Sequence, residues 1–411
     1  MSLAGAIEFA AKNNPAIVGS AADLAAAREA TGSARSRRLP SLSANGFATT
    51  GSYGAIYPSA PRADSAYSLL APKGGLLDAN LMLMWPLLTG GLIEAMIGSA
   101  ASQEAAAGYD LQEVRADVSV GVEDAYFRAL LAAENATAEE GRVEATADMV
   151  NRTLLLAEAG KGIEASVRRA QAELAQARRS LATVRGEQEK SMLDLKSTLG
   201  LDLDSSVVLS DALPDPGNAK PLPSYAESAD KQRGSVLAAR TRLRAAEADV
   251  RAAEGAQRPQ LYGVAMADAA TQSMARGASV GLVLSVPVFD GGGRRAETAR
   301  QRALRDRAAA SLRQTELNAQ KDVRQAYVDR TVADENLQSA QASVESAKAA
   351  YDVVSLRVAN GKGILVEQLD ALQALRRSRA DLAQARYDRA IAEARLRRAA
   401  GLPLVEEERS K

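Results

Sequence analysis

Apolar residues occupy every second position in residues 77–85 and again in residues 280–286. A period of two is typical of β-strands that have one apolar face. Each of these segments is followed by a long stretch, residues 91–159 and 293–360, that has no proline and very little glycine. Both stretches are rich in Ala, Glu, Gln, Arg and Leu, which favour helices, and about 68 helical residues would span roughly 100 Å. The pattern therefore predicts strands that lead into very long helices.

This order of elements occurs twice, because the chain contains an internal duplication. Pro86 and Pro287 lie 201 residues apart (287 − 86 = 201). Further pairs share this offset, namely Tyr126 with Tyr327, Gly160–Ile163 with Gly361–Ile364, and Gly200 with Gly401. Four matches without a gap over more than a hundred residues indicate two copies of one structural unit.

The offset is larger near the start of each copy. Leu39–Leu42 matches Arg258–Leu261 at 219 residues (259 − 40 = 219), so the first copy has 18 extra residues (219 − 201 = 18). We place these residues in an exposed loop between positions 53 and 75, which is rich in Ser, Pro, Gly and Tyr. The predicted parts of the chain are a first repeat, 1–201 (hairpin 41–86, helices 91–160 and 163–200), a connector, 202–223, a second repeat, 224–402 (hairpin 260–287, helices 293–360 and 364–400), and a charged tail, 403–411.

The strands predict how the chain assembles. No run of about 18 apolar residues is present, so no membrane-spanning helix is expected. Two hairpins give four strands per chain, which is too few to close a membrane β-barrel. Three copies would supply twelve strands and leave no exposed edge. The pattern therefore predicts a homotrimer.

Composition narrows the chemistry that is open to the chain. It contains no Cys and no His, which removes thiol nucleophiles, imidazole bases and the commonest zinc ligands. Lys plus Arg and Asp plus Glu both number 51, and aromatic residues make up only 4%. Without a basic excess or stacking platforms, nucleic acid is not an expected partner. An enzyme that uses carboxylates and Lys remains open, as does a soluble periplasmic coiled-coil protein with a structural or adaptor role.

The order of the elements and several short motifs resemble the outer membrane factors, the family of TolC-like channels. The motifs that carry the resemblance are Leu3–Pro15, the twice-repeated strand-to-helix junction at Trp85–Gly91 and Val286–Gly292, and the dipeptides Ala125-Tyr126 and Ala326-Tyr327. The resemblance covers nearly the whole chain. No single motif is specific, but their order and duplication are.

This resemblance implies a mainly α fold with β-strands, in which the duplicated antiparallel coiled-coil helices and four strands of each chain form a trimer with a 12-stranded β-barrel on a 12-helix α-barrel. It implies a passive channel of the bacterial outer membrane, surrounded by lipid, with a long periplasmic part. The channel would be the exit duct for drugs, metal ions or proteins in a tripartite efflux pump or a type I secretion system. Its partners would be a periplasmic adaptor and an inner-membrane pump of the RND, ABC or MFS type. No catalytic residue, cofactor or bound metal is expected.

The resemblance also assigns roles to individual residues. Glu367 and Asp370 match acidic positions that form rings at the narrowest part of the tunnel, where carboxylates from three copies favour cations. Arg168 and Arg169 are candidate partners of these acids. The alternative is an ordinary solvated helix face. The tyrosine, arginine and aspartate that lock the gate in some members fall here on Val358, Gly363 and Ser166, so that lock is not expected.

Two further sets of residues receive a role by resemblance. The helix-reversing turns, whose glycines tolerate positive φ, would contact the adaptor: Gly160, Lys161, Gly162, Gly361, Lys362 and Gly363. The junction between barrel and tunnel would contain Pro86, Gly90, Gly91, Pro287, Gly291 and Gly292. A phosphate-binding loop at Asp290–Gly293 is the weaker reading, because the motif lacks the Gly-Lys-Ser/Thr ending. From their position in or beside the strands, six aromatic residues are candidates for interfacial girdles, for shaping the outer opening, or for simple packing: Phe47, Tyr53, Tyr57, Tyr67, Trp85 and Tyr262.

Overall fold

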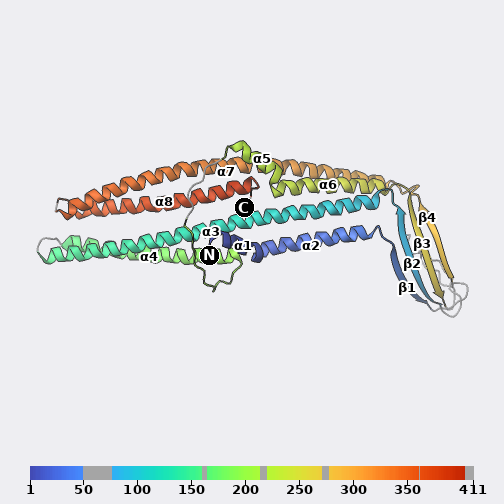
Figure 1. Cartoon of the computed structure of the whole chain (residues 1–411), viewed down its shortest axis with the longest axis horizontal. Coiled ribbons are helices and arrows are strands. Elements are labelled where there is room, and N and C mark those ends of the chain that lie inside the picture. The colour runs from blue at the N-terminus through green and yellow to red at the C-terminus, as the bar shows by residue number, and fades with distance from the viewer. Residues whose placement is uncertain (50–75, 160–163, 213–219, 271–276, 361, 403–411) are drawn as a thin grey trace, which may run out of the picture. The chain divides into compact units, whose positions relative to one another are not determined.

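The computed structural model describes residues 1–49, 76–159, 164–212, 220–270, 277–360 and 362–402 (Figure 1). In chain order these residues form α1 (Leu3–Asn13), α2 (Pro15–Ser36), β1 (Ser41–Thr49), β2 (Leu76–Leu88), α3 (Leu92–Glu158), α4 (Glu164–Leu199), α5 (Leu222–Gln232), α6 (Gly234–Gly255), β3 (Gln260–Ala270), β4 (Gly277–Ser285), α7 (Gly293–Ala359) and α8 (Leu365–Ala399). The chain divides into two compact units. The first comprises Met1–Asp23, Ala107–Ala238 and Arg313–Lys411, and the second comprises Leu24–Ala106 and Ala239–Leu312.

The two longest helices, α3 and α7, have 67 residues each and pass through both units. Neither contains proline, which would remove a backbone donor and kink the helix. Within the first unit, α4 and α8 return along α3 and α7 respectively. Arg185 of α4 pairs with Glu140 of α3 at 2.7 Å, and the hydroxyl oxygens of Ser343 on α7 and Ser378 on α8 lie 2.9 Å apart. Each pair of helices is therefore an antiparallel hairpin.

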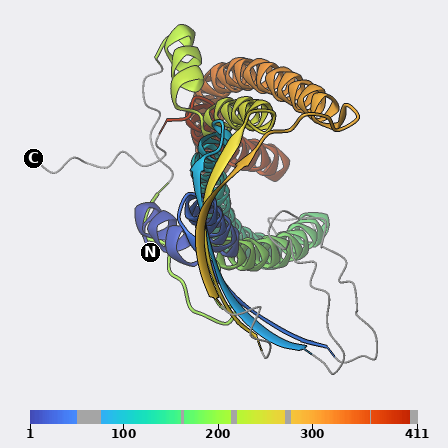
Figure 2. The same cartoon turned by 90° about the vertical axis from the view of Figure 1, so that its right-hand side faces the viewer.

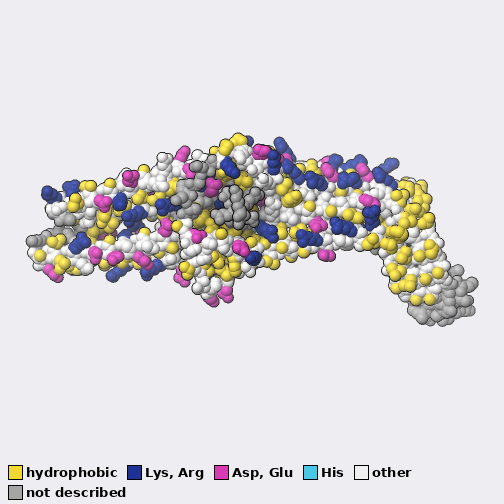
Figure 3. Space-filling view, in the orientation of Figure 1, with side chains coloured by type: hydrophobic (Ala, Val, Ile, Leu, Met, Phe, Trp, Pro, Cys, Tyr) yellow, Lys and Arg dark blue, Asp and Glu magenta, His cyan; other side chains and the backbone are white. Residues whose placement is uncertain are grey.

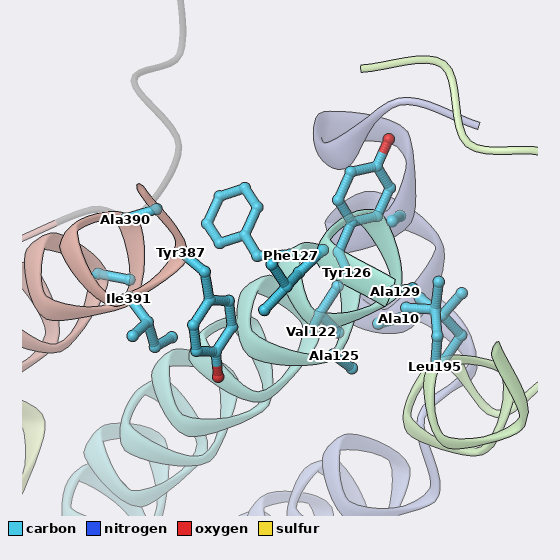
Figure 4. Close-up of a cluster of buried hydrophobic side chains, with 14 residues drawn as sticks. Ala10, Val122, Ala125, Tyr126, Phe127, Ala129, Leu195, Tyr387, Ala390 and Ile391 are labelled. Carbon is cyan, nitrogen blue, oxygen red and sulfur yellow. The ribbon is translucent and has the colours of Figure 1, made fainter. Parts of the chain in front are cut away.

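The core of the first unit repeats the duplication in three dimensions. One cluster joins α1, α3, α4 and α8 (Figure 4), and a second joins α5, α7 and α8. Val122 and Leu195 are fully buried in the first cluster, and Val323 and Leu396, each 201 residues further on, are fully buried in the second. Burying such side chains stabilises the fold by about 1.5–3 kcal/mol each. At these two pairs of positions, the two repeats thus use equivalent residues for their cores.

The second unit contains one antiparallel sheet of four strands in the order β1-β2-β3-β4 (Figure 2). Ser41 lies opposite Met84 in the first hairpin, and Gln260 lies opposite Ser285 in the second. The predicted class of fold, duplicated long helices with four strands, is confirmed. The pairing of β2 with β3, which joins the two hairpins into one sheet, is not among the pairings that the sequence predicts.

Glycines with positive φ link the strands to the long helices. Gly90 has a φ of 62° and Gly291, its counterpart in the second copy, a φ of 65°. A Cβ atom at Gly90 would lie 2.6 Å from Cβ of Arg258 and 2.9 Å from the carbonyl oxygen of Gly255, which is too close. At Gly291 no atom lies within 4 Å of that position. Positive φ favours glycine at both positions, but only at Gly90 does close packing within the chain also exclude a side chain.

Candidate functional site

The sheet has one face that is entirely apolar. Residues directly opposite each other in an antiparallel ladder point to the same face, so the register assigns every side chain. Apart from Gly46 and Gly263, the positions on this face whose side chains the structure describes are all apolar: Leu42, Ala44, Ala79, Leu81, Leu83, Trp85, Leu261, Ala265, Ala267, Ala269, Ala278, Val280, Leu282 and Leu284. Val280 is 87% exposed and Leu284 63% exposed. Within the single chain, this apolar surface is therefore largely uncovered.

The opposite face of the sheet is mixed, with polar side chains among methionines and two valines, Val264 and Val283. Asn45 donates a hydrogen bond to the side-chain oxygen of Asn80 at 3.0 Å, and Asn80 is buried. Tyr262 donates its hydroxyl proton to Gln260 at 2.6 Å, and Asp268 lies on the same face. The sheet therefore separates an apolar surface from a partly polar one, the arrangement that suits a wall between lipid and water. Figure 3 shows that hydrophobic side chains cover much of the sheet, whereas charged side chains are frequent along the helices.

The aromatic residues near the strands are placed only in part. Trp85 lies three residues before the end of β2 on the apolar face and is 48% exposed, whereas Tyr262 lies on the opposite face. Tyr53, Tyr57 and Tyr67 lie outside the described residues, as does the side chain of Phe47. Among the helices that the structure describes, none is both long and apolar enough to cross a membrane.

The candidate constriction residues lie near the start of α8. Glu367 and Asp370 are both exposed there, and Glu367 belongs to the first helical turn. On α4, Arg168 pairs with Glu164 of its own helix at 3.3 Å. Arg169 is exposed. In the part of the single chain that the structure describes, these arginines and acids form no ion pair with one another.

The second helix-reversing turn is described in part. The backbone amide of Lys362 donates to the carbonyl oxygen of Arg357 at 2.9 Å, which satisfies a carbonyl group at the end of α7. A Cβ atom at Gly363 would lie 2.9 Å from a methyl carbon of Val358, so the turn has no room for a side chain there. The Lys362 side chain is exposed. Gly160, Lys161, Gly162 and Gly361 lie outside the described residues.

In the glycine-rich segment before α7, the carboxylate of Asp290 binds backbone amides of the same segment. Asp290 accepts hydrogen bonds from the backbone amides of Gly292 and Arg294, both at 3.0 Å. The bond from the Arg294 amide, with that from Gly292, holds the pKa of the Asp290 carboxyl below its usual value. The Asp290 carboxylate therefore caps the start of α7. This leaves the two amides no free role in cradling a phosphate.

A buried carboxylate on α3 has no counterpart among the residues that the sequence singles out. Glu123 is 1% exposed, and its Oε2 accepts a hydrogen bond from Arg397 of α8 at 3.1 Å. Its Oε1 is buried without a hydrogen-bond partner. Burial raises the pKa of Glu123 to about 7, against the opposing effect of Arg397. The sequence offers no signal for this site, because charges are frequent all along these helices.

A second buried charge cluster connects α7 with α8. Arg330 donates to Glu393 at 2.8 Å and pairs with Asp334 at 2.9 Å. Arg389 pairs with the same two acids and is 4% exposed. Two arginines thus share two carboxylates, which satisfies most of the charge that burial would otherwise leave uncompensated. Because breaking a buried pair is costly, the cluster fixes how the two helices align.

Comparison with known proteins gives a consistent result. The sequence profile of the family described as "Outer membrane efflux protein" matches residues 6–201 and 226–402. No curated protein sequence matches the chain. The structure is similar to the outer-membrane channel OprN (26% identity, TM-score 0.82), covering 98% of this chain and 90% of that one. It also resembles the outer membrane protein VceC from Vibrio cholerae (19% identity, TM-score 0.80), covering 98% of this chain and 97% of that one. The open-state MtrE channel of Neisseria gonorrhoeae is similar too (18% identity, TM-score 0.79), with 98% of this chain and 89% of that one covered.

Proposed function

Because the chain belongs to the outer membrane efflux protein family, we propose that three copies assemble into one trimeric exit channel through the outer membrane. Members of this family are transport channels and not enzymes. They are located in the outer membrane, have a long periplasmic helical part, and serve as the exit duct of tripartite efflux pumps. An adaptor protein and an inner-membrane pump are therefore partners implied by the family.

The observation that carries the proposal is the uncovered apolar face of the sheet, together with its two open edges. A face on which every described side chain is apolar, such as that around Leu282, needs an apolar partner, and lipid supplies one. The outer edges of β1 and β4 have no strand partner within the part of the chain that the structure describes. Backbone groups at such edges cannot stay unpaired in lipid. Three copies pairing edge to edge would form a closed sheet of twelve strands.

The acidic residues near the start of α8 supply a further part of the proposal. In a trimer, Glu367 and Asp370 occur three times around one axis, so six carboxylates can line a narrow part of the tunnel. Both side chains are exposed in the single chain and thus free to face a lumen. Such a ring attracts cations and repels anions. Arg168 and Arg169, in the first repeat, are candidate partners of these acids, and in this proposal they pair with carboxylates of a neighbouring chain.

The helix-reversing turns and the cargo are the remaining parts of the proposal. We assign adaptor contact to the turns at residues 160–162 and 361–363, because each contains a lysine and the side chain of Lys362 is exposed. The channel would pass drugs, metal ions or proteins passively, since the energy comes from the pump. Efflux is the favoured role within this class.

The native mass of the protein tests the proposal. Protein extracted from outer membranes in detergent should have the mass of three chains of 43.1 kDa each, and it should precipitate when the detergent is withdrawn. A monomer or dimer that stays in solution without detergent would refute the channel and favour a soluble periplasmic rod.

A further inference from the structure

The two repeats of one chain meet within the sheet, where β2 of the first repeat pairs with β3 of the second. In this pairing Leu83 lies opposite Ala265, and Trp85 lies opposite Gly263. The remaining edges, β4 and β1, are the equivalents of β2 and β3 in the other repeat. A junction between two copies of the chain would therefore join the same two kinds of strand as the junction inside it.

We infer that β4 of one copy pairs with β1 of the next copy in a defined register, with Leu284 opposite Gly46, and that Val288 and Phe289 then pack on Ala44 and Leu42 of that neighbour. The inference rests on the trimer proposed above. The register between β4 and β1 of neighbouring chains is taken from the register between β2 and β3 within one chain.

The register follows from the two offsets of the duplication. Adding 201 to Leu83 gives Leu284, and subtracting 219 from Ala265 gives Gly46. The structure supports these offsets independently of the sequence match. They convert the first hairpin's pair, Ser41 with Met84, into Gln260 with Ser285, which is the pair observed in the second hairpin. Both hairpins therefore share one register, and the same transformation can be applied to the pairing between them.

The inferred register also keeps the two faces of the sheet continuous. Leu284 lies on the apolar face of β4, because it is opposite Leu261, and Gly46 lies on the apolar face of β1, opposite Ala79. A slip by one residue would place Leu284 beside Asn45 and mix the apolar face with the polar one. A slip by two residues preserves the faces, so only the duplication distinguishes that alternative.

Two exposed apolar side chains after β4 gain partners in this arrangement. Val288 is 91% exposed and Phe289 is 90% exposed within the single chain. Their equivalents in the first repeat are Leu87 and Leu88. Cδ1 of Leu87 lies 3.6 Å from the position that a Cβ atom would take at Gly263. The contact that Leu87 makes within the chain is thus the contact that Val288 would make with the next copy.

The two offsets also predict a second contact between copies, that of Phe289 with Leu42. Leu88 lies opposite Leu261 where β2 meets β3, and Phe289 and Leu42 are their equivalents. Leu42 is 67% exposed within the single chain, so both side chains have apolar surface to bury. Because an aromatic ring buries about 150–250 Å² when it is fully covered, Phe289 is the larger contributor to this contact.

One internal contact is not reproduced between copies. Within the chain, Arg258 donates from Nη1 to the carbonyl oxygen of Gly90 at 3.1 Å. The residue equivalent to Arg258 is Leu39, which has no side-chain donor. The junction between copies therefore depends on strand pairing and apolar contact, which makes Phe289 important to its strength.

Cysteine cross-linking in outer membranes tests the register, since the chain has no cysteine of its own. A variant with Leu284→Cys and Gly46→Cys should form covalent dimers and trimers when a membrane-permeable oxidant is added. Gly46 tolerates the change because no atom lies within 4 Å of its Cβ position. The matched control carries Leu284→Cys and Ala44→Cys. These positions would lie diagonally at about 7–8 Å, too far for an efficient disulfide, whereas direct partners lie about 4.5–5.5 Å apart.

The outcomes separate the inference from the proposed trimer. Cross-linking through position 46 and its loss through position 44 support the register. The reverse result, or no cross-link in protein whose native mass is still trimeric, overturns the register and leaves the trimer standing. A monomeric native mass removes both. As a second measurement, Phe289→Ala should lower the temperature at which the trimer dissociates in mild detergent, whereas Leu203→Ala, on an exposed side chain of the connector, should not. An unchanged temperature for Phe289→Ala would overturn the apolar contact.

Discussion

Replacing Glu123 by glutamine should remove a pH dependence from the stability of the helical unit. The carboxyl group is 1% exposed and has only one hydrogen-bonded oxygen, so its charge is poorly compensated even beside Arg397. Its pKa is about 7 in the folded chain, compared with an ordinary value of 4.5. Glu393, which lies nearby and is also acidic, adds to the rise. Glutamine has nearly the same shape and carries no charge at any pH.

The sign and size of the effect follow from proton binding. Between pH 4.5 and about 7 the folded chain keeps the proton of Glu123, while the unfolded chain releases it. The folded state then binds more protons, so the free energy of unfolding falls as the pH rises through this window. The full difference corresponds to about 3 kcal/mol. Relative to the unsubstituted protein, Glu123→Gln should therefore gain about 3 kcal/mol between pH 4.5 and pH 8.

Unfolding of the helices, followed by circular dichroism at a series of pH values, measures this difference. Glu134→Gln is the matched control, because Glu134 is an exposed acid on the same helix, and it should leave the pH profile unchanged. If Glu123→Gln and the unsubstituted protein lose stability in parallel between pH 4.5 and pH 8, the reasoning about the buried charge is wrong.

Three further predictions address the pore, the junction and the adaptor. Changing Glu367 and Asp370 to Ala together should abolish most of the channel's cation selectivity and its block by multivalent cations in bilayer recordings; an unaltered reversal potential would remove both residues from the constriction. Gly90→Ala should lower the free energy of unfolding, because positive φ alone costs an alanine about 1–2 kcal/mol and the new methyl group would lie too close to Arg258 and Gly255. The control, Gly141→Ala, lies in open space on a helix and should raise the free energy of unfolding by up to about 1 kcal/mol. Lys362→Glu should reduce capture of the adaptor in a pull-down while the trimer persists, and loss of the trimer instead would make the turn purely structural.

The elements of this fold are readable from sequence because each has a local signal. The alternation at Leu81, Leu83 and Trp85 marks a strand, and proline and glycine separate the strands from helices that contain no proline. The pairing of β2 with β3 has no such signal, since its partners are far apart in the chain and no short turn connects them. The buried state of Glu123 is equally invisible, because burial depends on which face of α3 meets α8. For the constriction, sequence supplies candidates such as Glu367, whose role depends on neighbouring copies.

The apolar face of the sheet affects the chain during its transport to the outer membrane, before assembly. A protein of the outer membrane must first cross an aqueous compartment, and there the face around Val280 would be wetted and the edges of β1 and β4 would be open. Exposed edges and apolar surface are the two features that drive strand-to-strand aggregation. Productive assembly therefore competes with aggregation at a rate that rises with the concentration of free chains. Slow synthesis, or a periplasmic chaperone that covers the sheet, should raise the yield of channel more than any change to the helices.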